Sequence, residues 1–236
     1  MAKKNTDKVV FHQIKVLDAG AKGVSVAKAP DGKVVFVSNV VPGDVVDVQT
    51  FKKRKAYYEG KAVKFHELSE HRVDPICEHF GVCGGCKWQN MKYSQQLFFK
   101  HNEVKNHLQR IGKIELPDFE PILGSEKQFF YRNKMEFSFS NSRWLTEAEI
   151  GSSEELDNKN ALGFHIPKMW DKILDINKCH LQEDPSNAIR NEVREFANAN
   201  GLTFFNPRAH EGLLRTLMLR TASTGEIMVL IQFFED

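Results

Sequence analysis

The chain has 236 residues, a formal net charge of +2 at pH 7, 41% hydrophobic residues and 27% charged residues. This composition excludes a disordered, collagen-like or disulfide-dense chain. Its apolar runs are far shorter than the roughly 20 residues of a membrane-spanning helix, and the charged start of the chain leads to Val9 without a secretory signal. The sequence therefore predicts a cytoplasmic protein with no membrane partner.

The charge is unevenly distributed along the chain. Residues 1–75 carry 14 Lys and Arg against 9 Asp and Glu, and residues 87–113 carry 6 against 1, so each segment has a net charge of +5. This asymmetry indicates an anionic partner for the first half of the chain. A solvated cationic face without a partner is an equally good interpretation of the charge alone.

The first 66 residues contain five short runs that are typical of β-strands. Turn signals separate the runs at Ala29–Gly32 and at Val41–Asp44, and no helical pattern intervenes. Five such strands predict an OB-like β-barrel. The expected strands are residues 9–17, 23–27, 33–37, 44–51 and 57–65.

A basic run flanked by aromatic residues lies between the last two expected strands. Lysine and arginine neutralise phosphates, and exposed rings stack on bases, so the run is a candidate RNA-binding hairpin. The alternative is that Phe51 and Tyr57 belong to the core and the charges keep the hairpin solvated. The candidate RNA contacts are Lys52, Lys53, Arg54, Lys55 and Tyr57.

The four cysteines carry the most specific pattern in the chain. Cys77, Cys83 and Cys86 have the spacing C-x5-C-x2-C, and Cys179 follows 93 positions later. Three thiols within ten residues of a cytoplasmic chain indicate metal binding rather than disulfides. Four cysteine sulfurs suit either zinc or an iron–sulfur cluster, and the spacing does not distinguish the two.

Several motifs in chain order resemble the bacterial RNA 5-methyluridine methyltransferases, the RumA/TrmA family. The resemblance implies that Cys77, Cys83, Cys86 and Cys179 hold a 4Fe–4S cluster, with zinc as the alternative. It also implies an N-terminal TRAM domain, which is an OB-like RNA-binding barrel. The motifs are residues 23–27, 31–37, 41–44, 77–89, 93–97, 108–112, 130–134, 173–181, 214–220 and 225–229.

The resemblance implies a multidomain α+β protein with three parts. Residues 1–67 form the TRAM barrel, and residues 68–113 form the cysteine-rich loop and an amphipathic helix. Residues 114–236 form an α+β central domain, truncated at its C-terminal end, which contributes the fourth cysteine. In the helix, an apolar stripe is expected at Tyr93, Leu97, Val104, Leu108 and Ile111.

The residues that carry out methyl transfer in this family are not matched. Family members use a cysteine nucleophile and S-adenosylmethionine, yet all four cysteines are assigned to the cluster and no G-x-G motif occurs. We therefore expect no catalytic residue and no S-adenosylmethionine site in this chain. It resembles an N-terminal portion that is inactive without the methyltransferase domain that follows in the family.

The central domain is expected to alternate strands with one helix. The pattern predicts strands at residues 129–140, 161–166 and 172–176, a helix at 187–200, and a hairpin formed by 215–220 and 226–234. Tyr131, Arg132 and Lys134 are further candidate RNA contacts, because arginine binds phosphate or stacks on bases. A structural strand edge is an equally good interpretation of these three residues.

Two functions follow from these expectations. The first is the RNA-recognition portion of an S-adenosylmethionine-dependent 23S rRNA (uracil-5-)-methyltransferase, acting as a monomer, whose 4Fe–4S cluster organises the RNA-binding region. The resemblance favours ribosomal RNA over transfer RNA. The second is a stand-alone, metal-stabilised RNA-binding protein without catalytic activity.

Overall fold

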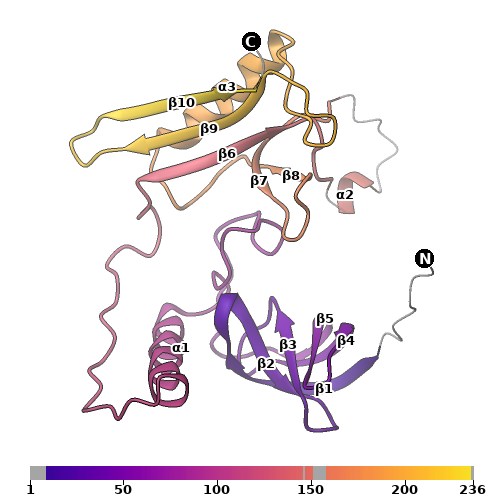
Figure 1. Ribbon diagram of the computed structural model, residues 1–236, viewed down its shortest axis with the longest axis vertical. Helices are drawn as coiled ribbons and strands as arrows, with labels where there is room; N and C mark the ends of the chain where they lie inside the picture. Colours follow the sequence, from indigo (N-terminus) through magenta and orange to yellow (C-terminus); the bar gives the residue numbers. More distant parts are fainter. Residues whose placement is uncertain (1–8, 146, 151–157, 235–236) are drawn as a thin grey trace. The chain divides into compact units, whose positions relative to one another are not determined.

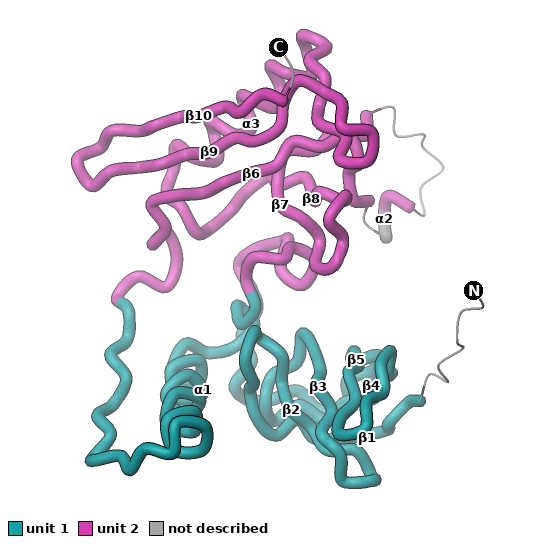
Figure 2. Tube along the Cα trace, in the orientation of Figure 1, with its two compact units in different colours: residues 1–75, 87–125 teal, residues 76–86, 126–236 magenta. Residues whose placement is uncertain are grey.

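The computed structural model describes residues 9–145, 147–150 and 158–234 (Figure 1). The chain forms two compact units, of which the first comprises residues 1–75 and 87–125 and the second comprises residues 76–86 and 126–236 (Figure 2). The cysteine-rich loop thus belongs to the second unit, although it interrupts the first in sequence. In the part of the chain that is described, no helix is long and apolar enough to cross a membrane.

The first unit contains a closed barrel of five strands, in the order β1-β2-β3-β5-β4. Neighbouring strands are antiparallel except for β3 and β5, which are parallel. The predicted OB-like barrel is confirmed, because period-two alternation and Pro/Gly turns place the strands close to their expected positions. The strands are β1 (Val10–Ala19), β2 (Val24–Lys28), β3 (Val34–Ser38), β4 (Val45–Lys53) and β5 (Tyr57–Glu67), with a short 3-10 turn at Ala21–Gly23.

The barrel core consists almost entirely of aliphatic side chains. Alternate residues of each strand point inward, so that side chains from all five strands meet, and those from β1, β3 and β4 are β-branched. Phe11 packs edge-on against Tyr58, with ring centroids 5.0 Å apart. The buried core residues are Ile14, Val16, Ala27, Ala29, Val35, Val37, Val40, Val46, Val48 and Tyr58.

A buried carboxylate ties the turn before β4 to the segment that leaves β5. Asp44 has no exposed surface. It accepts hydrogen bonds from the backbone N–H groups of Val41 (2.7 Å) and Ser69 (2.9 Å), and from Nε (2.8 Å) and Nη2 (2.7 Å) of Arg72. Gly43 is required beside it, because its φ is +101° and a Cβ there would lie 2.6 Å from the Ser69 hydroxyl. The bidentate arginine compensates the buried charge.

The predicted helix of the first unit is present as α1 (Tyr93–Asn106), which continues into a π-helical turn at His107–Ile111. Its one buried residue is Phe99, which packs in a cluster with Ala19, Val41 and Met91. The predicted apolar stripe lies elsewhere on the helix and is partly exposed, since Val104 and Ile111 on it are 49% and 75% exposed. The residue that packs on the barrel is Phe99, which is not part of the stripe.

The second unit is built on a five-stranded antiparallel sheet with the order β10-β9-β6-β7-β8. Helix α3 (Ser186–Ala199) packs on one face of the sheet, where Ala197, Ile189 and Val193 meet the core (Figure 1). The predicted α+β region is confirmed. The strands are β6 (Lys134–Ser140), β7 (Ala161–His165), β8 (Ile173–Asp175), β9 (Leu214–Thr221) and β10 (Ile227–Phe233), and a short helix α2 spans Glu147–Ile150.

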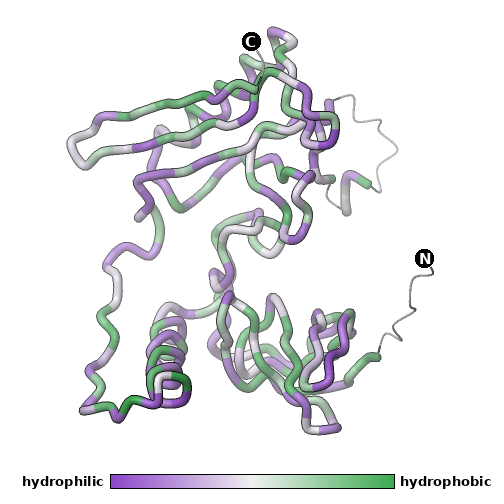
Figure 3. The backbone as a smooth tube through the Cα atoms, in the orientation of Figure 1, coloured by the Kyte–Doolittle hydropathy of each residue, from purple (hydrophilic) through white to green (hydrophobic). Residues whose placement is uncertain are grey.

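The core of this sheet lies between its central strands and α3. Register pairs Met135 with Leu219 and Phe137 with Leu217, so these four buried side chains form adjacent rows on one face. Strand β10 differs from the others, because it is hydrophobic along its length and largely exposed (Figure 3). The exposed fractions of Met228, Val229 and Leu230 are 47%, 46% and 42%.

Candidate metal centre and RNA-contacting surfaces

The loop that carries three of the cysteines is a series of tight turns at residues 76–86. The N–H of Phe80 donates to the carbonyl of Cys77 (3.1 Å), and the N–H of Cys83 donates to the carbonyl of His79 (2.8 Å). Gly81 permits this path, because its φ is +88°. The N–H of Gly85 points at the sulfur of Cys83, 3.4 Å away. Backbone donors of this kind stabilise a thiolate.

The fourth cysteine is held by the first turn of α3. Asn187 accepts a hydrogen bond from the N–H of Cys179 (2.8 Å) through Oδ1, and its Nδ2 donates to the Cys179 carbonyl (3.2 Å). One amide side chain thus fixes the peptide on both sides of Cys179. This places the cysteine at the edge of the core formed by the sheet and α3.

The fold brings the four cysteines of the second unit into one region. All four are half-buried, Cys86 and Cys179 border one apolar cluster, and Cys83 and Cys179 border another. Burial raises the pKa of Cys86 from 9.0 to about 11, and negative charge on Cys179, Cys83 and Cys77 adds to this increase. Among the described residues, no three His, Cys, Asp or Glu side chains are arranged to hold a single metal ion.

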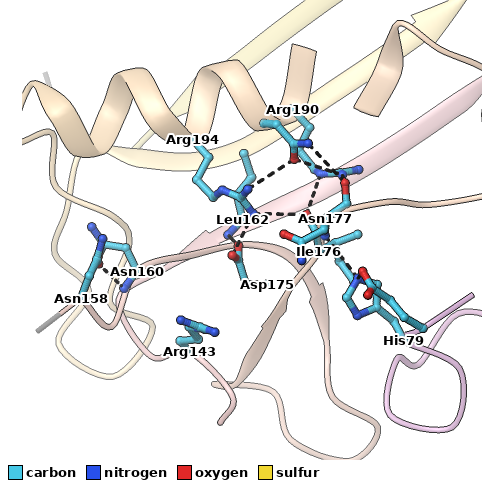
Figure 4. A network of polar contacts seen from close by, with 12 residues as sticks. His79, Arg143, Asn158, Asn160, Leu162, Asp175, Ile176, Asn177, Arg190 and Arg194 are labelled. Carbon is cyan, nitrogen blue, oxygen red and sulfur yellow. Dashed lines mark hydrogen bonds and ion pairs between the residues drawn. The ribbon is translucent and has the colours of Figure 1, made fainter. Parts of the chain in front are cut away.

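A buried arginine without an acidic hydrogen-bond partner lies next to this region (Figure 4). Arg190 of α3 has no exposed surface. It donates to the carbonyls of Ile176 (3.2 Å) and Asn177 (2.6 Å), and to the side-chain oxygens of Asn187 (3.0 Å) and Asn191 (3.3 Å). All these acceptors are neutral, whereas a buried charge normally needs a counter-charge.

Electrostatics identify Cys179 as the main potential counter-charge. Burial lowers the pKa of Arg190 from 12.5 to about 10, and a thiolate at Cys179 gives the largest opposing effect, ahead of Asp175. Asp175 is itself paired with Arg194, at 2.8 Å (Figure 4). The arrangement therefore suits an anionic group at the cysteines.

A histidine of the cysteine loop also contributes to this network (Figure 4). Nε2 of His79 accepts a hydrogen bond from the N–H of Asn177 (3.2 Å), which joins the loop to the segment before Cys179. Sequence reasoning missed His79, Asn187 and Arg190. Of these three residues, only His79 could have been identified from the sequence, because it is a histidine inside the cysteine motif. Asn187 and Arg190 look like ordinary polar residues of an amphipathic helix.

The second set of candidate RNA contacts lies beside Cys179 in the fold. The N–H groups of Phe130 and Arg132 donate to the carbonyls of His180 (2.9 Å) and Leu181 (2.8 Å). This pairing explains why β6 begins at Lys134, later than predicted. Tyr131, Arg132 and Lys134 all have exposed side chains, and Tyr131 is 55% exposed. The positive charge of Arg132 favours the thiolate forms and so acts to lower the pKa of Cys86 and Cys179.

The first set of candidate RNA contacts forms the hairpin between β4 and β5. Lys53, Arg54 and Lys55 are exposed, and Lys52 is half-buried in an ion pair with Glu59. Tyr57 is half-buried, edge-on to Phe36 at 5.3 Å. Phe51 is 45% exposed, and Tyr58 is the tyrosine that enters the core. The hairpin therefore presents three cations at its tip.

Comparison with known proteins gives a consistent family. Residues 12–63 match the TRAM domain family. A Bacteroides thetaiotaomicron protein named an uncharacterized RNA methyltransferase is 56% identical over 89% of this chain and 46% of its own length. A Porphyromonas gingivalis protein of the same name is 44% identical over 94% of this chain and 49% of its own.

A solved structure shares the fold. The Pyrococcus abyssi tRNA (uracil-54, C5)-methyltransferase, in complex with S-adenosyl-L-homocysteine, matches with a TM-score of 0.62 and 24% identity, over 95% of this chain and 47% of that one. The chain spans about half the length of the curated relatives it matches. The TRAM match and these relatives together show that the chain is similar, over 89% and 94% of its length, to proteins named RNA methyltransferases.

Proposed function

We propose that the chain is the RNA-recognition portion of an S-adenosylmethionine-dependent 23S rRNA (uracil-5-)-methyltransferase. The observation that carries the proposal is the match of 89% of the chain, at 56% identity, to a protein named an RNA methyltransferase. The structural neighbour supports the uracil-5 reaction, since it is a tRNA (uracil-54, C5)-methyltransferase in complex with S-adenosyl-L-homocysteine, the product that S-adenosylmethionine leaves after methyl transfer. Its substrate is a transfer RNA, so the choice of ribosomal RNA rests on the sequence resemblance alone.

The barrel supports RNA binding through its exposed hairpin. Lys53, Arg54 and Lys55 have exposed side chains, and their clustering at one tip suits contact with phosphates. Lys52 differs from them because Glu59 already compensates its charge. The hairpin therefore contains both the proposed phosphate contacts and a lysine that serves as a control.

Cys77, Cys83, Cys86 and Cys179 suit a bound 4Fe–4S cluster. Ligation by thiolates supplies the negative charge that the buried Arg190 lacks. A single zinc ion would require all four sulfurs within about 2.3 Å of one point, whereas a four-iron cluster binds each cysteine at a separate iron. The choice of the cluster over zinc therefore rests on the sequence resemblance.

The cluster, when bound, supplies a structural cross-link between the cysteine loop and the segment after β8. The protein's own residues complete this link. Asn187 holds the Cys179 peptide, and His79 holds Asn177. Both candidate RNA-contacting residues Tyr131 and Arg132 lie on a segment paired with residues 180–181, so ordering at Cys179 also orders them.

Methyl transfer itself is assigned to the full-length protein. The reaction joins the methyl group of S-adenosylmethionine to uracil C5 and removes the C5 proton, and in this family a cysteine adds transiently to C6. The four thiols of this chain have another role in the proposal. The part described here would recognise the RNA and hold it in place.

Two measurements test the proposal. Iron, sulfide and zinc analysis of the anaerobically purified chain should give about four irons and four sulfides per chain. The full-length protein should transfer tritiated methyl groups from S-adenosylmethionine to 23S rRNA, with tRNA as the comparison. A result of one zinc without sulfide would contradict the proposed 4Fe–4S cluster. Methylation of tRNA alone would contradict the proposed ribosomal substrate. A natural stop codon after Asp236 would favour the stand-alone RNA-binding protein.

The hairpin is tested by its effect on salt dependence. Each phosphate contact contributes about 0.7 to 0.9 to the slope of log affinity against log salt. Combined Lys53→Gln, Arg54→Gln and Lys55→Gln should lower the slope by about 2, whereas Lys52→Gln should lower it much less. Equal effects of the two variants would contradict the proposed contact.

A further inference from the structure

An exposed tryptophan occupies a rigid turn of the second unit. Trp170 lies between β7 and β8 and is 62% exposed. The turn is closed by hydrogen bonds from the N–H of Ile166 to the Lys172 carbonyl and from the N–H of Met169 to the Ile166 carbonyl, both 3.0 Å. Lys168 takes a left-handed φ of 69° within it. Among the described residues, no hydrophobic cluster includes this indole, so core packing there does not account for it.

A second segment places an arginine against this indole. Arg208 comes from the turn before β9, and its guanidinium carbon lies 5.9 Å from the Trp170 ring centre. Its Nε and Nη2 both donate to Oδ2 of Asp171, at 2.7 and 2.6 Å. Asn206 fixes the backbone there, because its Oδ1 accepts from the N–H of Arg208 (3.0 Å). The guanidinium is therefore fixed in position while 72% of the side chain stays exposed.

The charges around the indole are mainly positive. Asp171 is buried and its carboxylate is compensated by Arg208; this pairing lowers its pKa from 3.8. Lys168 is exposed in the same turn. Lys172 ends the turn, and its Nζ donates a hydrogen bond to the Ser142 hydroxyl (2.7 Å). A flat apolar ring next to fixed and flexible cations matches an unpaired nucleobase and its phosphate. A purely apolar protein partner would have no use for these cations.

We propose that Trp170 and Arg208 form a stacking platform for one unpaired nucleobase of the bound RNA, with the base on the indole and the adjacent phosphate on the guanidinium. The proposal rests on the proposed function, because that function supplies the RNA. It adds a binding site distinct from the barrel hairpin and from residues 131–134.

The cysteine loop supports this platform directly. A Cβ at Gly84 would lie 3.0 Å from the carbonyl oxygen of His165 and 3.5 Å from Cγ of Pro167. The loop backbone therefore packs against the start of the turn that carries Trp170. Order in the cysteine loop is thereby transmitted to the indole, so the cluster and the platform act on the same bound RNA.

The test measures binding of a fluorescein-labelled, single-stranded, uridine-rich RNA to the metal-loaded chain by fluorescence anisotropy. Trp170→Ala should weaken binding about tenfold, as expected for one lost stack, while Trp170→Phe should stay within about threefold of wild type. The Trp170→Ala loss should be the same at every salt concentration. Arg208→Ala should lower the salt slope by less than the roughly 0.7 of a full phosphate contact, because Asp171 already compensates part of the Arg208 charge. Phe196→Ala is the matched control, since Phe196 is an aromatic residue of α3 that is 60% exposed.

The outcomes separate this inference from the function on which it rests. Wild-type chain that does not bind RNA contradicts the proposed function. Wild-type binding that Trp170→Ala leaves unchanged, or that Phe196→Ala weakens equally, overturns the platform alone. A lower melting temperature of full-length Trp170→Ala protein without a loss of RNA affinity also overturns it, because it would place Trp170 against another part of the protein.

Discussion

The two units of the chain are stabilised in different ways. The barrel has an aliphatic core, and its buried carboxylate, Asp44, has a full set of donors that includes the guanidinium of Arg72. In the second unit, cysteines border both apolar clusters, and the buried cation Arg190 has only neutral acceptors. The buried charge of the barrel thus has a direct ion pair, whereas the burial of Arg190 is offset by Cys179, Asp175 and Asp184 without a hydrogen bond from the guanidinium to any of these groups among the described residues.

This difference indicates where stability depends on a bound group. Buried charge is tolerated when it is paired, and removing a partner leaves a penalty of several kcal/mol. The stability of the barrel should therefore be independent of bound metal, whereas the stability of the second unit should depend on it. Four changes test this contrast.

Loss of the cluster should have the largest effect, and it should be confined to the second unit. Structural metal sites contribute on the order of 10 kcal/mol to folding. Cys83→Ser, or anaerobic chelation of the iron, should raise amide hydrogen exchange in β6 and β9 to nearly unfolded rates. Exchange in β3 and β4 is the internal control, and equal loss of protection in both units would contradict the contrast.

Asp44→Ala should destabilise the barrel by about 3 to 5 kcal/mol, because it leaves the Arg72 charge and two backbone N–H groups without their acceptor. Chemical denaturation followed by exchange in β4 measures this loss. Asp31→Asn is the control. The Asp31 side chain is 42% exposed, so this substitution should cost much less stability. Iron content should not change in either variant; a loss of iron in Asp44→Ala would show that the barrel also depends on the cluster.

Arg190→Met should destabilise the loaded second unit by about 2 kcal/mol, because it removes one donor from each of the Ile176 and Asn177 carbonyls and removes the counter-charge of the bound cluster. The metal-free form should lose less, since there the arginine is itself uncompensated. Arg194→Met on the same helix is the matched control, because Arg194 is paired with Asp175. Its cost should be equal with and without the cluster, and iron occupancy should fall only in Arg190→Met.

The smallest expected effect is a pH dependence of the barrel. The N–H of Gln13, with smaller contributions from His66 and His12, lowers the pKa of Asp47 from 3.8 to about 2. A carboxylate with a depressed pKa stabilises the fold above its ordinary pKa, and this contribution is lost as the pH falls through the folded value. Melting of the barrel should therefore become easier between about pH 4 and pH 2, and Asp47→Asn should flatten this dependence.

Local patterns were sufficient to predict most of the secondary structure. The five barrel strands follow from short β-branched runs between Pro/Gly turns, and α3 ends just before Gly201, as predicted. The β9–β10 hairpin follows from two apolar runs joined by a short polar segment. Each of these features is encoded by neighbouring residues, which is why single-sequence reasoning finds them.

Features that depend on distant contacts were not predictable. Helix α1 buries Phe99, which is outside the expected apolar stripe, because Ala19, Val41 and Met91 lie next to it. Arg190 looks like a solvent-facing residue of an amphipathic helix, and only the carbonyls of residues 176 and 177 make it a buried one. In the metal site, the motif identified the four cysteines, but nothing in it indicated the asparagine and arginine that support Cys179.

The uncompensated charge of Arg190 also bears on how a cluster would enter the protein. Without metal, water solvates the guanidinium better than the neutral acceptors do, so hydration of Arg190 favours local opening of the segment around Cys179. An opened segment exposes the thiols to whatever carrier delivers iron and sulfide, and binding of the anionic cluster then favours closure. The same buried arginine would thus keep the site receptive before loading and retain the cluster afterwards.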